Sequence, residues 1–357
     1  MKPGPGKARS IVVALLDWFQ SSARELPWRR TRDPYGIWVS EIMLQQTQVA
    51  TVVPYWERWM RELPTIQALA KASPARVHKL WEGLGYYSRV RNLQKAAQTV
   101  VASHDAKFPS EFQQVLALPG IGRYTAGAIC SIAFNQPTPI LDGNVIRVLT
   151  RLFAIPGNPR APEINSQLWS LAEKLVRLAA TAGKPRSSGK LNESLMELGA
   201  LICTPRDPDC VHCPVRIHCS ARRQDRAAAF PQLPRRRKSV QRRVAAFIVR
   251  DGSRVLVRQR PAGGVNAQLW EFPNAELGAG PESAARAAGT LGFTLAESDP
   301  VCTIRHSITH HRITLQVYHA RALGRPKTND GQWLTAPELQ KLAFPSAHRR
   351  LLEFLTS

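Results

Sequence analysis

The spacing of hydrophobic residues divides the chain into two parts. From about Ile11 to Ala200, apolar residues recur every three or four positions, in runs such as VHKLWEGL, RVRNLQKAAQTVVASH and SQLWSLAEKLVRLAAT. This period is typical of amphipathic helices, and the runs are interrupted by proline and glycine, which break helices. The pattern predicts an all-α domain made of many short helices.

The pattern changes after Gln241. The run VAAFIVRDGSRVLVRQRP places two β-rich segments around an Asp-Gly pair, which is the signature of a β-hairpin. PVCTIRH and ITLQVYHA indicate further strands, while PESAARAAGTLGF and HRRLLEFLTS indicate helices. These elements predict a smaller α+β domain.

A segment without either period separates the two parts. Residues 221–240 are basic and contain proline, which is typical of a linker. Such a segment is either a solvated loop or a contact with DNA or a partner, and the sequence leaves both open. We therefore expect a domain over residues 1–220, a linker over residues 221–240 and a domain over residues 241–357.

Charge is the feature of the composition that indicates a class of partner. The chain of 357 residues carries a formal net charge of +23, shared between both parts and the linker, so no single basic tail explains it. Such an excess favours a polyanion, above all nucleic acid, although a basic surface kept for solubility is the alternative.

The apolar segments of the sequence indicate the cellular compartment of the protein. No stretch reaches the roughly 18 apolar residues of a membrane span, and Asp17 and Gln20 interrupt the N-terminal apolar run where a signal peptide would be cleaved. We expect no membrane association and a cytoplasmic, nucleoid-associated protein. Cysteines inside a cell are more often metal ligands than disulfides.

Four cysteines close the helical part. They follow the spacing C-x6-C-x2-C-x5-C, which is tight enough for one loop to surround a single centre. Four thiolates suit tetrahedral zinc and a [4Fe–4S] cluster equally well, and His212 or His218 can replace a cysteine at zinc. The spacing predicts a metal centre and leaves the metal open. Its ligands are Cys203, Cys210, Cys213 and Cys219.

The stretch LPGIGRYTAGAIC, residues 118–130, predicts a turn followed by a helix. Gly120 and Gly122 supply positive φ and bare backbone, which suits a turn whose N–H groups face an anion. Arg123 then opens a helix and places these amides at its positive end. The alternative is an ordinary helix–turn–helix corner.

Two carboxylates stand in apolar surroundings. Glu41 lies in YGIWVSEIMLQQTQV, where desolvation would raise its pKa toward that of a general acid; the alternative is a surface glutamate. Asp142 lies in PTPILDGNVIRV between an apolar run and a helix. It suits an N-cap supported by Asn144, and a helix N-terminus would also keep it ionised.

These motifs together resemble one family. SEIMLQQTQV, WEGLGYYSRVRNL, LPGIGRYTAGAI, LDGNVIRV, NESLMELGALIC and the cysteine loop resemble, in this order, adenine DNA glycosylases of the MutY type, from the helix-hairpin-helix superfamily that includes endonuclease III. The resemblance implies a multidomain protein. Its parts would be an all-α glycosylase domain with the hairpin at about 111–134 and a [4Fe–4S] loop at 203–219, and a Nudix-like α+β domain.

The resemblance also implies an activity, the removal of adenine mispaired with 8-oxoguanine or G in double-stranded DNA, by a monomer. Glu41 matches the general acid that protonates adenine. Asp142, with Asn144 beside it, matches the carboxylate that stabilises the sugar cation or its covalent adduct. The cysteines match [4Fe–4S] ligands, which by analogy favours iron.

Tyr124 stands where bifunctional members of the superfamily carry a lysine. That lysine attacks the sugar as an amine, forms a Schiff base and nicks the strand. A phenol forms no Schiff base, so Tyr124 predicts base excision without an efficient lyase step. A glycosylase/lyase resembling endonuclease III is a rival hypothesis, against which Tyr124 argues. An iron–sulfur DNA-binding or redox module without catalysis is another, against which the retention of both carboxylates argues.

The remaining family positions concern the DNA. The adenine must be flipped out of the duplex, and Gln46 and Tyr86 match residues that then enter the stack. The alternatives are a helix-surface amide and a core aromatic. The hairpin would hold a phosphate, and a set of five would line the adenine pocket. These positions are Leu118, Gly120, Gly122 and Arg123 for the hairpin, and Trp28, Arg29, Leu44, Val49 and Glu193 for the pocket.

The C-terminal part resembles the family's second domain, which is related to Nudix hydrolases. Those enzymes need an R-E-x-x-E-E helix, but PESAARAAGTLGF offers only Glu282, so we expect recognition of 8-oxoguanine rather than hydrolysis. The family's recognition loop carries Phe-Ser-His, where this chain has Ile308, Thr309 and His310. Thr309 keeps a hydroxyl and Ile308 loses an aromatic face. The alternative is a polar hairpin without a ligand.

Overall fold

The computed structural model describes residues 5–234, 239–278, 280, 283–324 and 331–355. Its contacts form two compact units, which we describe separately. Unit 1 comprises Met1–Lys71 and Asn92–Arg235, and unit 2 comprises Ala72–Arg91 and Arg236–Ser357. Nothing in the hydrophobic pattern indicates that Ala72–Arg91 packs with the C-terminal half, so this grouping is a tertiary feature.

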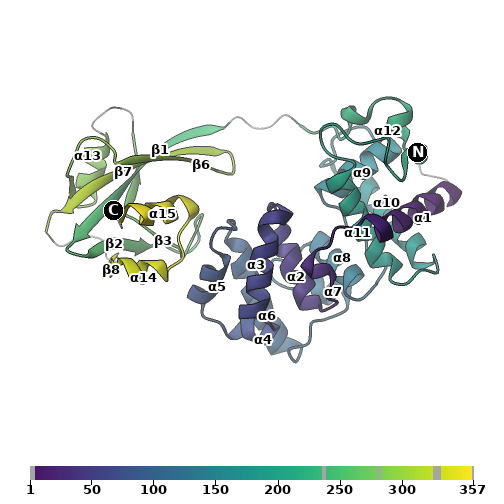
Figure 1. The fold of residues 1–357 in the computed structure, drawn as a ribbon, viewed down its shortest axis with the longest axis horizontal. Coiled ribbons are helices and arrows are strands. Elements are labelled where there is room, and N and C mark those ends of the chain that lie inside the picture. Colours follow the sequence, from purple (N-terminus) through teal and green to yellow (C-terminus); the bar gives the residue numbers. More distant parts are fainter. Residues whose placement is uncertain (1–4, 235–238, 279, 281–282, 325–330, 356–357) are drawn as a thin grey trace. The chain divides into compact units, whose positions relative to one another are not determined.

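Unit 1 consists of helices and loops in its described part (Figure 1), as the three- and four-residue spacing predicts. Proline and glycine separate the helices, and α1, α2 and α10 each begin with proline, whose fixed φ suits the first turn. Helices also enter the predicted linker, in α12 (Ser220–Arg223) and a 3-10 turn at Ala227–Ala229. A distant side chain holds this segment, because Arg151 Nε donates to Ala227 O at 2.9 Å and to Phe230 O at 3.0 Å. The helices are α1 (Pro5–Ser22), α2 (Pro34–Leu44), α3 (Val49–Glu62), α4 (Ile66–Lys71), most of α6 (Ser88–Ser103), α7 (Phe112–Leu116), α8 (Arg123–Ile132), α9 (Gly143–Phe153), α10 (Pro162–Ala180), α11 (Ser187–Leu201) and α12 (Ser220–Arg223), with 3-10 turns at Pro27–Arg29 and Arg216–His218.

One hydrophobic core of unit 1 lies between α1, α9, α10 and α11. Leu15, Leu149, Leu175 and Leu195 are among its fully buried side chains. α11 approaches the start of α9 so closely that a Cβ on Gly199 would lie 2.6 Å from the Cβ of Asn144. Only glycine permits this distance, which fixes the beginning of α9 against α11.

The predicted hairpin connects α7 to α8, and α8 begins at Arg123 as expected. Gly120 has φ +77°, and a Cβ there would lie 2.5 Å from the Cβ of Asn92. Gly122 has φ −97°, so the expectation that both glycines supply positive φ is wrong for Gly122. Open space surrounds the Cα of Gly122, with nothing within 4 Å of a Cβ there.

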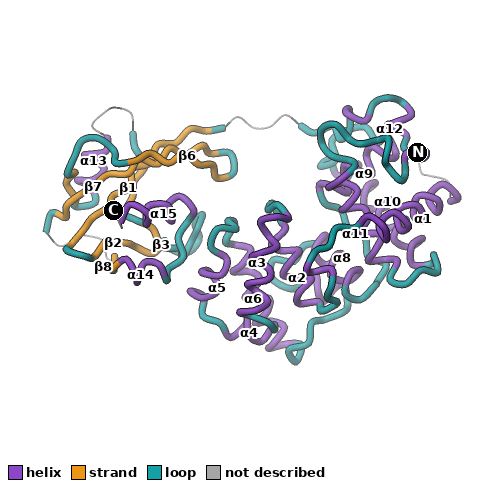
Figure 2. Tube along the Cα trace, viewed as in Figure 1, coloured by secondary structure: helices purple, strands orange, loops and turns teal. Residues whose placement is uncertain are grey.

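Unit 2 contains a mixed sheet (Figure 2) with the main strand order β3-β2-β1-β7-β5. The Asp-Gly hairpin is confirmed, because Asp251 of β1 pairs with Arg254 of β2. β1 also runs parallel to β7, from Val240 opposite His311 to Val249 opposite Ala320. The strands are β1 (Val240–Asp251), β2 (Arg254–Gln259), β3 (Trp270–Glu271), β4 (Asn274–Glu276), β5 (Phe293–Leu295), β6 (Cys302–Ile308), β7 (His311–Ala322) and β8 (Gly331–Thr335).

Both faces of this sheet are covered. Phe247 of β1 packs toward α13 (Ser283–Thr290), while its neighbour Ile248 packs on the other side with Phe344 and with α14 (Ala336–Gln340) and α15 (Ser346–Arg350). Alternation of side chains along β1 therefore supplies two cores. Glu282, named above, lies outside the described residues.

Unit 2 contains two further short helical elements. α5 (Pro74–Trp81) belongs to unit 2, and a 3-10 turn at Leu351–Leu355 follows α15. In the described part of the chain, no helix combines the length and the apolar character needed to cross a membrane.

Candidate active site

Unit 1 contains a cavity of about 550 Å³ between α2, α8, α9 and α11. The folded chain brings ten of the sequence-predicted site residues to its wall, although they come from four separate stretches of sequence. This gathering is a property of the tertiary structure. The ten are Trp28, Arg29, Glu41, Leu44, Gln46, Val49, Tyr124, Asp142, Asn144 and Glu193.

Glu41 is a buried carboxyl group on α2, with 5% of the residue exposed. The Tyr124 hydroxyl on α8 donates a hydrogen bond of 2.7 Å to Glu41 Oε2. Burial raises the pKa of Glu41 to about 7; the bond from Tyr124 opposes this rise, and the charge of Asp142 adds to it. Near neutral pH, a protonated and an ionised form of Glu41 are therefore both populated.

Asp142 is half-buried and is the N-cap of α9, so the cap and the site coincide. It accepts bonds from Val145 N at 2.7 Å and Asn144 Nδ2 at 3.2 Å. Burial raises the pKa of Asp142 above its ordinary value, although these bonds oppose the rise. The expectation that the helix N-terminus keeps Asp142 ionised did not include this desolvation, which acts in the opposite direction.

Glu197 is a residue of this cavity that the sequence analysis missed. It is buried to 1% exposure and accepts bonds from Arg24 Nη2 at 2.7 Å and from Arg29 Nη2 at 3.0 Å. Burial alone would raise the pKa of Glu197, but these two arginines outweigh it and lower the pKa to about 2. Glu197 lies on α11 one helical turn after Glu193, and that spacing was the signal available in the sequence.

Arg29 connects this ion pair to Glu193, whose Oε1 lies 3.4 Å from Arg29 Nε. Burial nevertheless raises the pKa of Glu193, with Arg29 acting in the opposite direction. The cavity therefore holds one carboxylate fixed as an anion, Glu197, and others with raised proton affinity.

Arg147 links the cavity to the cysteine loop. Its Nη2 donates to Asn144 Oδ1 and to Gly199 O, each at 2.7 Å, and its Nε donates to Cys203 O at 2.7 Å. Asn144 in turn contacts Asp142. A continuous chain of hydrogen bonds therefore runs from the start of the cysteine loop to the N-cap of α9.

The four predicted cysteine ligands lie on one loop after α11, and all are free thiols. Burial raises the pKa of Cys213, and the other three thiols each act electrostatically on it, so the set lies close together. Buried Arg151 donates to Cys203 Sγ at 3.4 Å and to Thr204 O at 2.6 Å. Among the described residues, no three or more His, Cys, Asp or Glu side chains are arranged to hold a metal ion. The four thiols are the type of ligand that a thiolate-bound metal centre needs. Their side chains are not turned toward one common point in this structure.

The two residues predicted to enter the base stack share a backbone feature. Gln46 of unit 1 has φ +60° and Tyr86 of unit 2 has φ +46°, and neither is glycine. Left-handed residues of this kind are held by their surroundings and cluster at functional sites. Tyr86 is 44% exposed, which contradicts a buried core aromatic.

The hairpin residues lie outside the wall of the cavity. Leu118 is buried, and the Arg123 guanidinium lies 4.0 Å from the centre of the Trp169 ring. Arg123 therefore packs on α10 while its backbone opens α8.

The predicted lesion loop forms the turn between β6 and β7 in unit 2. Ile308 pairs with His311, so Thr309 and His310 are its two central residues. Thr309 has φ +54°, a strained value for a β-branched residue, and its hydroxyl donates to Ile308 O at 2.7 Å. Thr309 is an exposed residue at the turn.

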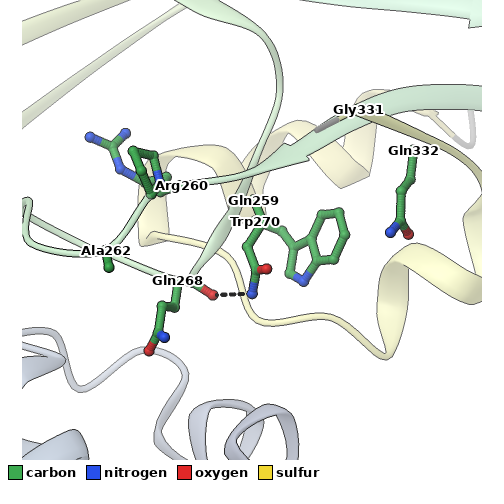
Figure 3. Close-up of a pocket in the computed structure, with 8 residues that line it drawn as sticks. Gln259, Arg260, Ala262, Gln268, Trp270, Gly331 and Gln332 are labelled. Carbon is green, nitrogen blue, oxygen red and sulfur yellow. Dashed lines mark hydrogen bonds between the residues drawn. The ribbon is translucent and has the colours of Figure 1, made fainter. Parts of the chain in front are cut away.

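Unit 2 also contains an open pocket of about 500 Å³ at β2, β3 and β8 (Figure 3). Trp270 lies in its wall beside Gln259, whose amide donates to Gln268 O at 2.9 Å. None of the sequence-predicted site residues lines it.

The fold and the cavity define a helix-hairpin-helix repair protein with an appended Nudix-like domain. Residues 39–174 match the HhH-GPD superfamily of base excision DNA repair proteins, and residues 244–354 match the NUDIX domain family. The chain is 37% identical to the adenine DNA glycosylase of Rattus norvegicus, over 94% of this chain and 76% of that protein. It is 36% identical to the one of Homo sapiens, over 95% and 72%. The chain belongs to the adenine DNA glycosylase family.

Solved structures agree with this fold. A thermostable thymine-DNA glycosylase has a TM-score of 0.55 and 29% identity, covering 61% of this chain and 98% of that one. Endonuclease III in a non-covalent DNA complex has a TM-score of 0.51 at 19% identity, covering 63% and 99%, and thus shares the fold.

Proposed function

We propose that this chain is a monofunctional DNA glycosylase that removes adenine mispaired with 8-oxoguanine or with G. The observation that supports it most is the pairing of buried Glu41, bonded to Tyr124, with Asp142 in one cavity. The charge of +23 supports double-stranded DNA as the substrate. Its relatives are named adenine DNA glycosylases.

In the proposed reaction, Glu41 transfers its proton to a ring nitrogen of the flipped adenine. The bond between this base and the sugar carbon then breaks, and the electron pair leaves with the adenine. Asp142 stabilises the positive charge left on the sugar, and water adds there. The proton that the water loses replaces the one that Glu41 gave to the adenine, so the acid returns to its starting form. A pKa of about 7 suits Glu41 to the first step.

The other cavity residues would bind the base. Trp28, Leu44 and Val49 offer apolar surface, while Arg29 and Glu193 offer polar groups to its edge. Gln46 and Tyr86 would enter the stack, and the hairpin with Leu118, Gly120, Gly122 and Arg123 would hold a phosphate.

We propose that residues 1–220 carry out catalysis, that residues 221–240 are a linker and that residues 241–357 recognise 8-oxoguanine. At the β6–β7 turn, Thr309 offers a hydroxyl to 8-oxoguanine, with Ile308 and His310 beside it. The protein would act as a monomer in the cytoplasm, on the nucleoid.

We also propose that Cys203, Cys210, Cys213 and Cys219 hold a [4Fe–4S] cluster. The supporting observations are four free thiols within electrostatic reach of each other and the donor Arg151 at Cys203. A bound cluster would tie the loop to the helical core. Iron and sulfide analysis with visible absorption tests this; bound zinc without sulfide would contradict it.

The deciding experiment is single-turnover incubation with a duplex that holds one A opposite 8-oxoguanine, each sample divided with and without hot alkali. We expect the A strand to break only after alkali, because Tyr124 offers no amine for a Schiff base. Breakage without alkali would contradict the monofunctional assignment. No breakage in either would contradict the glycosylase.

A further inference from the structure

The loop Gly83–Tyr87 between α5 and α6 presents Tyr86 on the surface of unit 2. Tyr86 is 44% exposed and has φ +46°, so its backbone is held in a conformation that a tyrosine seldom adopts. Something must therefore hold the loop in place, and the contacts of unit 2 show what does.

One support comes from within the loop's own helices. The Arg89 guanidinium lies 5.1 Å from the centre of the Trp81 ring and 5.7 Å from that of Tyr86. Its Nη2 also donates to Leu84 O at 2.9 Å and to Gly85 O at 3.2 Å. This cation joins the loop to the end of α5.

The second support is Glu82, which precedes the loop and joins it to the C-terminal domain. Its side chain is only 12% exposed. Oε1 accepts the backbone N–H of Phe344 at 2.9 Å, and Oε2 accepts from Lys79 Nζ at 2.7 Å and lies 3.3 Å from Arg349 Nη1. Burying a carboxylate costs free energy unless hydrogen bonds and opposite charges compensate for the lost water. The three partners therefore fix where the Glu82 side chain lies.

Neighbouring groups repeat the connection. Lys79 Nζ also donates to Leu342 O at 2.9 Å, and the Tyr87 hydroxyl donates to Phe344 O at 3.4 Å. Phe344 is fully buried and stacks on Phe272 at 6.0 Å between ring centres. The loop is therefore tied to the core of the α+β domain.

We propose that Glu82 is a positioning residue, through which the C-terminal domain holds the Tyr86 loop in the conformation that opens the base stack. This inference rests on the proposed function for its effect on excision, but its structural part does not. Binding of the C-terminal domain to a lesion would thereby be coupled to the residue that probes the stack. Excision should be sensitive to this contact, because a small displacement of a group that positions the substrate lowers the reaction rate by a large factor.

The test compares Glu82→Ala with Glu276→Ala in the full chain. Glu276 pairs with Arg242 at 3.0 Å within the C-terminal domain, but it is half exposed and does not contact the loop, so it is the matched control. The first measurement is hydrogen exchange of the amides of residues 83–88 without DNA. Glu82→Ala should speed this exchange by about tenfold or more, and Glu276→Ala should leave it unchanged.

The second measurement is single-turnover excision in the native chain and in Tyr86→Ala. Glu82→Ala should slow excision by about tenfold in the native background and not further in Tyr86→Ala, because both changes remove one function. Glu82→Gln, which can still accept the Phe344 N–H, should restore part of the rate. If Glu82→Ala does not fold, Glu82→Gln replaces it in both measurements.

Unchanged exchange at residues 83–88 in Glu82→Ala would overturn the inference, as would equal rate losses in both backgrounds. If the native chain removes no adenine, the proposed function fails, and the exchange measurement still decides whether Glu82 holds the loop.

Discussion

Four acidic residues in one cavity show how surroundings set proton affinity. Glu41 and Glu197 are both buried glutamates, yet the pKa of Glu41 is about 7 and that of Glu197 is about 2. Glu197 has two arginines within hydrogen-bond distance, while Glu41 has the neutral Tyr124 hydroxyl. The difference lies in the partners supplied by the fold.

We expect Glu41→Gln to slow adenine excision by about 10³-fold, since an amide has no proton to give and general acid catalysis contributes about 10²–10⁴-fold. Affinity for mismatched DNA should persist. The native chain should lose stability as the pH rises from 4.5 to about 7, because the carboxyl group of Glu41 ionises more readily in the unfolded chain than in the folded one. The variant lacks this carboxyl group and should not show that loss. A normal excision rate in this variant would contradict the proposed acid.

The pH dependence follows from the raised pKa of Glu41. The active form is protonated, so excision should be fastest below about pH 7 and fall as the pH rises through it. The bond from Tyr124 lowers the pKa of Glu41, so Tyr124→Phe should move this fall to higher pH. Single-turnover excision rates of the native chain and of Tyr124→Phe, measured across pH, test this shift. Identical pH profiles would show that the bond from Tyr124 does not affect the pKa of Glu41.

At the scale of elements, the hairpin between α7 and α8 carries two glycines with different tasks. Gly120→Ala places a methyl group against Asn92 at positive φ, which should cost about 1–3 kcal/mol of unfolding free energy. Gly122→Ala meets neither obstacle and should change stability by about 0.5 kcal/mol or less.

DNA affinity then separates the roles of these glycines. If the hairpin holds a phosphate, Gly122→Ala should weaken binding while the fold stays intact, since its methyl group would occupy the open space. Thermal unfolding and DNA titration together check both variants. If Gly120→Ala and Gly122→Ala destabilise the fold equally, the positive φ of Gly120 and its contact with Asn92 do not determine the loss of stability.

For the whole molecule, the charge of +23 predicts strong salt dependence. A protein that contacts six to ten phosphates loses about 10³–10⁵ in affinity between about 50 and 200 mM salt. We expect titrations to show such a slope, while the excision rate of fully bound complexes changes little. A shallow slope would contradict DNA as the partner of the basic surface.

Much of the site could be predicted because its residues stand in short motifs. Glu41, Asp142 and Tyr124 each occupy a local pattern that the sequence displays, and the cavity joins them. Glu197 escaped prediction because its burial and its bonds with Arg24 and Arg29 depend on contacts between residues more than 160 positions apart.

The sequence by itself determined the helical part, the α+β part and the hairpin at Asp251, because periodicity and turn chemistry act over a few residues. Only the tertiary structure decided the protonation of Glu41, the different φ values of Gly120 and Gly122, and the grouping of Ala72–Arg91 with the C-terminal half. These properties depend on desolvation and on packing between distant segments, which no local pattern records.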